Sequence, residues 1–129
     1  FIALEFVDSP GVTVVMPGGA LRAASASLVG DEGACILDRY HVQKGFFSAG
    51  GFTLEEGLTD TSQYEVELKQ RMVDRSKAVI ALVDSSKWGQ VTFASLASVG
   101  QLDQVISDSA APPAMVAALR QQGIEVVLV

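Results

Sequence analysis

The stretch Lys77-Ala-Val-Ile-Ala-Leu-Val-Asp-Ser-Ser-Lys87 joins a continuous apolar run to an abruptly polar end. The apolar run, residues 78–83, is too short to cross a membrane. It predicts a strand that is buried on both faces, as in a parallel sheet. Ligands of open α/β sheets bind outside the carboxyl ends of the strands. Asp84, Ser85 and Lys87 are therefore candidate contacts for an anion, and a plain polar turn is the alternative.

Length and composition bound the possible functions. The chain has 129 residues, of which 49% are hydrophobic, enough for the core of one domain. The net charge is −6 and no block of Lys or Arg occurs, so we expect no nucleic-acid binding by these residues. No apolar run is long enough for a membrane span. The first residue is Phe, so we expect a fragment or a processed product.

Cysteine and histidine each occur once. Cys35 can form no internal disulfide, so the simpler expectation is a reducing compartment, the cytoplasm. His41 has no cluster of possible metal ligands near it in the sequence. We therefore expect no metal site and no cofactor.

Two glycine pairs follow predicted strands. Residues 12–16 are rich in β-branched side chains and predict a short buried strand, which Gly18-Gly19 follows. Residues 42–49 predict a second core strand, which ends in Gly50-Gly51. Paired glycines let a backbone approach a ligand closely, and they equally form plain tight turns.

The remaining patterns predict helices and connections. Residues 21–28 are expected to be extended, and residues 31–40 helical with Asp31 as N-cap. Residues 53–61 are expected to form a polar loop. Ser62 and Glu65 have the spacing of a capping box, with Tyr64, Leu68, Met72 and Val73 on the apolar face of the helix that follows. The pairs Glu65–Lys69 and Glu67–Arg71 have i,i+4 spacing.

The carboxyl-terminal part continues the alternation. Residues 91–99 allow no firm assignment. Residues 102–106 and 124–129 predict strands, and between them a helix begins at Pro112-Pro113 and ends before Gly123. The total is five strands alternating with about three helices, which predicts an α/β fold with a mostly parallel sheet.

An ordered set of short motifs then resembles a known family. The set comprises Gly18-Gly19, Leu21-Arg22, Leu28-Val29-Gly30, Phe46-Phe47-Ser48-Ala49-Gly50-Gly51-Phe52, Glu56-Gly57-Leu58-Thr59, Glu65, Asp84-Ser85-Ser86-Lys87, Ile106-Ser107-Asp108 and Gly123-Ile124-Glu125-Val126. In this order and spacing it is similar to the carboxyl-terminal sensor domain of DeoR-type bacterial transcriptional regulators, over nearly the whole chain.

The resemblance implies a Rossmann-like, mostly parallel sheet with flanking helices, related to the ribose-phosphate isomerase fold. It implies a phosphorylated sugar or similar metabolite as effector, and DNA binding through a separate amino-terminal helix-turn-helix. Residues 1–129 would be a single domain that lacks that helix-turn-helix and the first βαβ unit of the sensor. The ligand-binding candidates are Gly18, Gly19, Arg22, Ser48, Gly50, Gly51, Glu65, Asp84, Ser85 and Lys87, and no catalytic residue is implied.

Two further functions are weighed against effector binding. A sugar-phosphate isomerase needs a carboxylate base beside the substrate. The isomerases carry an Asp-Gly-Ala-Asp-Glu run where this chain has residues 47–51, with Gly50 and Gly51 at the positions of the acids. An oligomerisation role is compatible with sensing, because regulators of palindromic operators are usually symmetric and residues 124–129 are apolar enough to form an interface. Glu65 keeps the alternative role of a capping acid.

Overall fold

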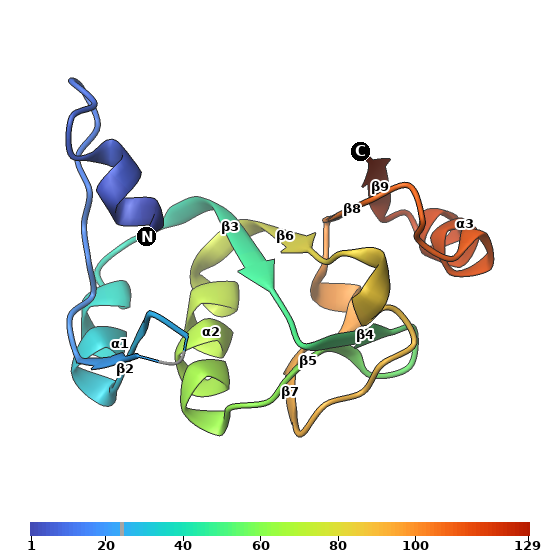
Figure 1. The fold of residues 1–129 in the computed structure, drawn as a ribbon, viewed down its shortest axis with the longest axis horizontal. Coiled ribbons are helices and arrows are strands. Elements are labelled where there is room, and N and C mark those ends of the chain that lie inside the picture. The colour runs from blue at the N-terminus through green and yellow to red at the C-terminus, as the bar shows by residue number, and fades with distance from the viewer. Residues whose placement is uncertain (24) are drawn as a thin grey trace.

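The computed structural model describes residues 1–23 and 25–129. Its helices are α1 (Asp31–Leu37), α2 (Gln63–Arg75) and α3 (Pro113–Gln121), with short 3₁₀ helices at Ile2–Phe6, Ser85–Lys87 and Val99–Gln101. Its strands are β1 (Ala20–Arg22), β2 (Ser27–Val29), β3 (Val42–Ser48), β4 (Gly51–Thr53), β5 (Gly57–Asp60), β6 (Ser76–Leu82), β7 (Ala94–Ala97), β8 (Gln104–Ser107) and β9 (Glu125–Leu128). Figure 1 shows residues 1–40 at one end of the molecule and α3 at the other.

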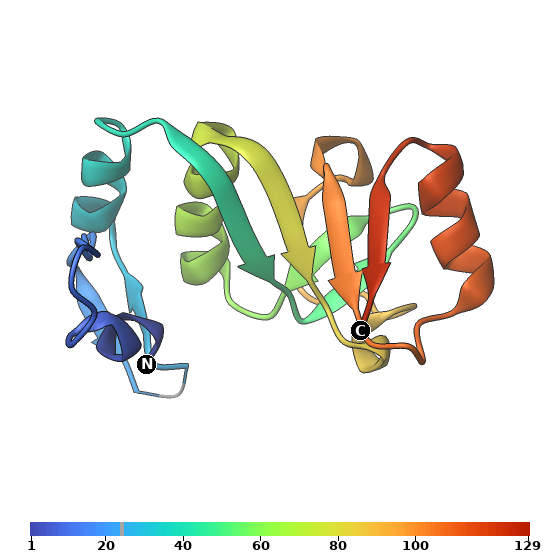
Figure 2. The same cartoon turned by 90° about the horizontal axis from the view of Figure 1, so that it is seen from above.

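The main sheet has the strand order β3-β6-β8-β9, and every neighbouring pair is parallel. The apolar run therefore forms the predicted inner strand, and Val79, Ile80 and Ala81 are buried. Leu82 is 41% exposed, so the predicted burial on both faces does not extend to the end of the strand. α2 packs beside β3 and β6, and α3 packs beside β9. The prediction of an α/β fold with a mostly parallel sheet and flanking helices is confirmed. All four arrows point the same way in Figure 2, so the carboxyl ends of the four strands lie along one side of the sheet, which we call the carboxyl edge.

The prediction of a buried strand over residues 12–16 is wrong. The structure has no strand there, and Val12, Val14, Val15 and Met16 are 42–56% exposed. β-Branched side chains favour strands because they pack well on a half-buried pleated surface. No other described strand offers this segment a partner or such a surface, so its composition alone does not make it a strand.

The polar loop predicted over residues 53–61 is instead largely a buried hairpin. β4 and β5 pair antiparallel, and β5 also pairs with β7, which lies in the stretch that the sequence left unassigned. Polar side chains are tolerated inside because they are bonded: the Thr59 hydroxyl accepts from the Thr92 N–H at 2.9 Å. Phe52 and Leu58, both fully buried, join this small sheet to the core of the main sheet.

Helix α2 forms as predicted, but its surface contacts differ. Val66, Leu68 and Val73 are buried, whereas Tyr64 is 73% exposed. Ser62 is the N-cap residue without a side-chain cap bond, so the predicted capping box is not formed. The expected i,i+4 ion pairs, Glu65–Lys69 and Glu67–Arg71, do not occur either. Two of these side chains pair with neighbouring elements instead: Glu65 with Arg22 and Lys69 with Asp60. Glu67 accepts a hydrogen bond from Gln63 of the same helix.

Two smaller predictions also change before residue 40. Residues 21–28 are not simply extended, because β1 and β2 pair as an antiparallel hairpin. The N-cap of α1 is Gly30, with φ 124°, rather than Asp31. β2 of this hairpin contacts α2.

The carboxyl-terminal predictions are confirmed. β8, α3 and β9 follow in order, α3 has a proline in its first turn, and Gly123 takes φ 84° after the helix. Val105 and Leu119 are fully buried between these elements. Among the described residues, no helix is both long and apolar enough to span a membrane.

We predict that Gly57→Ala destabilises the fold by about 2–4 kcal/mol, because the site needs a left-handed residue and has no room for a methyl group. Gly57 has φ 70°, and an added Cβ would lie 2.1 Å from the carbonyl oxygen of Ala97. Gly100→Ala is the matched control, since nothing lies within 4 Å of its added Cβ. Urea unfolding of both variants measures the difference, and equal stabilities would contradict the prediction.

Candidate ligand-binding site

The shared carboxyl edge of the main sheet collects residues from three strands. β3 ends at Ser48, which pairs in register with Leu82 at the end of β6. Asp84 therefore follows just beyond the same edge, and Asp108 follows the end of β8. Neighbouring strands lie about 4.8 Å apart. The predicted sites after β3 and after β6 are thus adjacent at one edge.

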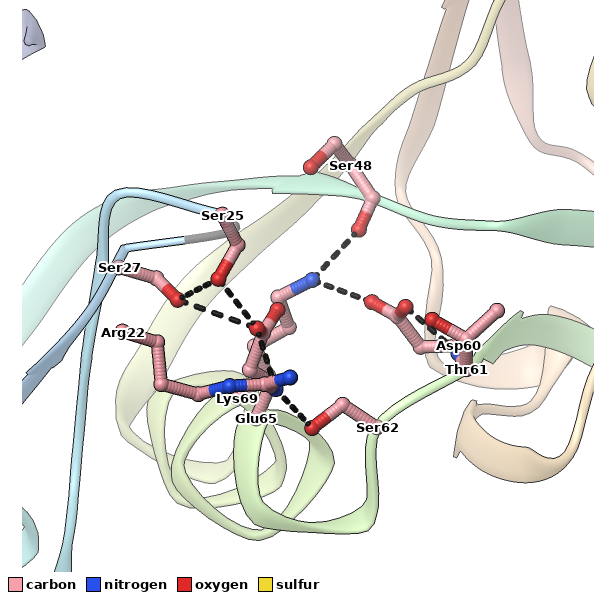
Figure 3. A network of polar contacts seen from close by, with 9 residues as sticks. All are labelled: Arg22, Ser25, Ser27, Ser48, Asp60, Thr61, Ser62, Glu65 and Lys69. Carbon is pink, nitrogen blue, oxygen red and sulfur yellow. Dashed lines mark hydrogen bonds and ion pairs between the residues drawn. The ribbon is translucent and has the colours of Figure 1, made fainter.

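Glu65 is the centre of a polar network between the β1–β2 hairpin and α2 (Figure 3). Its Oε1 atom accepts hydrogen bonds from Arg22 Nη1 at 3.0 Å, Ser25 Oγ at 2.7 Å and Ser27 Oγ at 3.1 Å. The same Arg22 nitrogen donates to Ser62 Oγ at 2.5 Å. The carboxylate that was a candidate capping acid therefore fixes the hairpin turn against the first turn of α2.

Lys69 lies one helical turn after Glu65 and points to the end of β3. Its ammonium donates to the carbonyl oxygen of Ser48 at 3.2 Å and to Asp60 Oδ2 at 2.5 Å. Asp60 is buried, and its other oxygen accepts from the Thr61 N–H at 2.7 Å. The ion pair joins a largely buried carboxylate to a lysine whose side chain is 22% exposed. The Thr61 N–H fixes Asp60, and the Ser48 carbonyl oxygen fixes Lys69.

A cavity of about 170 Å³ opens between these two groups. Its polar lining comes from Ser27, Ser48, Glu65 and Lys69. Its apolar wall comes from side chains of β2, β3 and α2, namely Leu28, Phe46, Phe47, Leu68 and Met72. The cavity can therefore enclose a small group that carries both apolar faces and hydroxyls.

The turn after β6 is ordered by two carboxylates. Asp84 accepts from the hydroxyl and the N–H of Ser86, and these bonds lower the pKa of Asp84. Asp108 accepts from the N–H of Ser85 at 2.5 Å and from that of Ala110 at 2.9 Å, which lowers the pKa of Asp108. Both carboxylates stabilise the 3₁₀ turn Ser85–Lys87 by binding its backbone and that of the next loop.

Lys87 ends this turn as a half-buried residue. In the part of the chain that the structure describes, its ammonium makes no hydrogen bond or ion pair. Asp84 and Ser85 lie beside it, but they already serve the turn. The structure therefore brings the candidates together in two groups. Ser48 and Glu65 line the cavity, with Arg22 bound to Glu65. Asp84, Ser85 and Lys87 follow β6.

Backbone conformation or lack of space explains why glycine occupies most of the four candidate positions. Gly18 and Gly19 take φ 78° and 98° at the open end of the β1–β2 hairpin, opposite to the turn that holds the Glu65 network. A Cβ on Gly19 would lie 2.5 Å from the Val29 carbonyl oxygen. Gly51 is as restricted, with an added Cβ 2.4 Å from the Gln90 carbonyl oxygen, whereas a Cβ on Gly50 would meet Thr92 at 3.3 Å.

Five polar residues of the Glu65 and Lys69 contacts were missed as site residues: Ser25, Ser27, Asp60, Ser62 and Lys69. The i,i+4 spacing of Glu65 and Lys69 is visible in the sequence and predicts an ion pair within the helix. That spacing is equally compatible with two side chains that face the same cavity. Burial of Asp60 depends on the β4–β5 hairpin, which the sequence did not reveal.

Comparison with known proteins gives consistent matches. The family described as the DeoR C terminal sensor domain matches residues 1–109. The uncharacterized HTH-type transcriptional regulator YulB of Bacillus subtilis is 36% identical over 98% of this chain and 49% of its own length. The HTH-type transcriptional regulator GolR of Listeria innocua is 35% identical over 98% and 50%. A putative aga operon transcriptional repressor of Escherichia coli O157:H7 is 30% identical over 99% and 48%. The chain thus spans about half the length of the curated relatives it matches.

We predict that acid weakens the fold partly through Asp108. Because its pKa is lowered in the folded state, the carboxylate stabilises the fold at pH values above the unfolded pKa, and this stabilisation is lost as the pH falls through the folded pKa. Asp108→Asn should be less stable than the wild type at about pH 6, and the difference in the free energy of unfolding between the two proteins should narrow towards about pH 2. Denaturant unfolding at several pH values measures the gap.

Asp8→Asn, in the exposed amino-terminal segment, is the control for the loss of one carboxylate. A gap for Asp108→Asn that stays constant with pH would contradict the assignment.

Proposed function

The chain belongs to the DeoR family, as a sensor domain of DeoR-type transcriptional regulators, and from this premise we propose that it binds a phosphorylated sugar or a related metabolite as the effector of such a regulator. The observation that carries the proposal is the cavity at the carboxyl end of β3, with Glu65 and Lys69 in its wall. Carboxyl ends of parallel strands are where α/β folds hold ligands.

The residues divide by chemistry into a phosphate side and a sugar side. Lys87 is proposed as the cation for the phosphate, because it ends the turn that follows β6 and its ammonium bonds to no described residue. Asp84 and Ser85 hold the turn that carries it. On the sugar side we propose Ser48 and Glu65, which line the cavity, and Arg22, which is bound to Glu65. Gly18, Gly19, Gly50 and Gly51 remain proposed backbone contacts.

An isomerase-like enzyme is less well supported. A general base must stand within hydrogen-bond reach of the substrate. Gly51 occupies a position where the resemblance to isomerases would place an acid, and the backbone of Gln90 leaves no room for a side chain there. The known relatives with described roles are transcriptional regulators. Both facts favour sensing over catalysis.

Contact with DNA is proposed to lie outside residues 1–129. The chain carries a net charge of −6, which opposes binding to phosphate backbones. The relatives are described as helix-turn-helix regulators and are about twice as long. We also propose self-association, for which β9 offers a sheet edge with Leu128 40% and Val129 79% exposed.

We predict that Lys87→Ala weakens binding of a sugar phosphate about ten- to a hundredfold, because one charge-assisted hydrogen bond to a partly desolvated phosphate is worth roughly 1.5–3 kcal/mol. Lys87→Arg should not fully restore binding, since a planar fork does not replace a point charge. Calorimetric titration with glucose 6-phosphate, fructose 6-phosphate and ribose 5-phosphate measures the loss.

Lys77→Ala is the matched control, because Lys77 is exposed at the amino end of the same strand. Its affinity should equal that of the wild type. If Lys87→Ala also binds with wild-type affinity, Lys87 is a solvated turn residue. If no member of the panel binds the wild-type protein, the proposed effector class is wrong.

A further inference from the structure

The cavity beside β3 carries a donor and an acceptor one helical turn apart. We propose that Lys69 and Glu65 form a subsite that reads two adjacent hydroxyl groups of the effector, at the end of the sugar remote from its phosphate. This inference rests on the proposed function and specifies which part of the effector binds in the cavity. Figure 3 shows Lys69 directed towards Ser48 and Asp60, and Glu65 directed towards the serines of the hairpin turn.

Lys69 has bonding capacity left for a ligand. An ammonium has three N–H donors. The described contacts use two of them, one to the Ser48 carbonyl oxygen and one to Asp60 Oδ2. Since Lys69 also lines the cavity, its third donor is available to a hydroxyl oxygen there.

Glu65 offers the complementary acceptor. Its donors from Arg22, Ser25 and Ser27 all converge on Oε1. No described residue donates to Oε2, although the side chain is only 13% exposed. This oxygen can therefore accept a hydrogen bond from a ligand hydroxyl that enters the cavity.

The two side chains do not neutralise each other. Glu65 and Lys69 have i,i+4 spacing, yet each is held by other partners, at distances of 3.0 Å to Arg22 and 2.5 Å to Asp60. Their positions are therefore fixed before a ligand arrives, which reduces the entropic cost of binding. A diol suits this arrangement, because each of its hydroxyls both donates and accepts.

The charge balance excludes the phosphate from this subsite. Arg22 and Lys69 contribute two positive charges, while Glu65 and Asp60 contribute two negative charges. A phosphate dianion would meet the Glu65 carboxylate in the cavity wall, while Asp60 already neutralises Lys69, so no net positive field would hold it there. The volume of about 170 Å³ is also below the roughly 300 Å³ of typical whole-ligand pockets, so only part of the effector enters.

The test compares sugar phosphates that lack one hydroxyl at a time. Wild-type protein is titrated calorimetrically with the best binder among glucose 6-phosphate, fructose 6-phosphate and ribose 5-phosphate, and with the monodeoxy analogues of that sugar. We expect loss of either hydroxyl of one adjacent pair to weaken binding about tenfold or more. Lys69→Met should weaken binding of the parent sugar by a similar factor and abolish the discrimination for one hydroxyl of the pair.

A second variant guards against misfolding. Lys69→Met leaves the buried Asp60 without its cation, so the double variant Asp60→Asn/Lys69→Met removes both charges and is titrated in parallel. Glu65→Gln should abolish discrimination for the other hydroxyl. Glu67→Gln is its control, because Glu67 is exposed on the same helix.

Each outcome decides the matter. Loss of discrimination in the Lys69 and Glu65 variants, with Glu67→Gln unchanged, supports the subsite. Binding with unaltered discrimination in both variants overturns the subsite and leaves the proposed function standing. If no sugar phosphate binds the wild-type protein, the proposed function fails and the subsite fails with it.

Discussion

Two-sided pairing of β6 is the constraint on which the structure depends. Its backbone bonds in parallel to β3 on one side and to β8 on the other, while Val79, Ile80 and Ala81 are buried. Parallel strands need crossovers, so each connection must return to the amino edge before the next strand begins. The return after β3 places α2 against the sheet, and the return after β8 places α3. All loops that follow the strands are consequently left on one edge.

This arrangement explains why the candidate residues come from distant parts of the chain. Ser48, Asp84 and Asp108 are separated in sequence, but Ser48 ends one strand of the main sheet, and Asp84 and Asp108 follow two others. The Glu65 network arises differently, because it joins α2, which packs on the main sheet, to the β1–β2 hairpin outside that sheet. Arg22, Ser25 and Ser27 reach α2 through side chains alone. One carboxylate thus couples the position of the hairpin turn to the wall of the cavity.

The sequence predicted correctly those elements that are marked by a continuous apolar run or by the local signals of a helix. The run at residues 78–83 forms a strand, and helices α2 and α3 form over the predicted residues, although Tyr64 of the predicted apolar face is exposed. Residues 12–16 and 53–61 failed for opposite reasons. The first segment is apolar yet finds no described strand to pair with. The second is polar yet largely buried, because Thr59 bonds to Thr92 and Asp60 bonds to Lys69 of the next helix. The site followed the same rule: the edge was predictable from strand ends, whereas Lys69 was not, since its role depends on tertiary contacts.

The residue after Lys87 gives this edge an optical property. Trp88 is the only tryptophan of the chain, it is 5% exposed, and its Nε1 donates to the buried Ser107 hydroxyl at 3.0 Å. Its ring meets Phe52 edge-on, with centroids 5.0 Å apart. The indole therefore connects the 3₁₀ turn after β6, the end of β8 and the small sheet. Intrinsic fluorescence of the protein on excitation of tryptophan arises from one chromophore at the strand edge, and its emission wavelength reports the polarity of that edge alone.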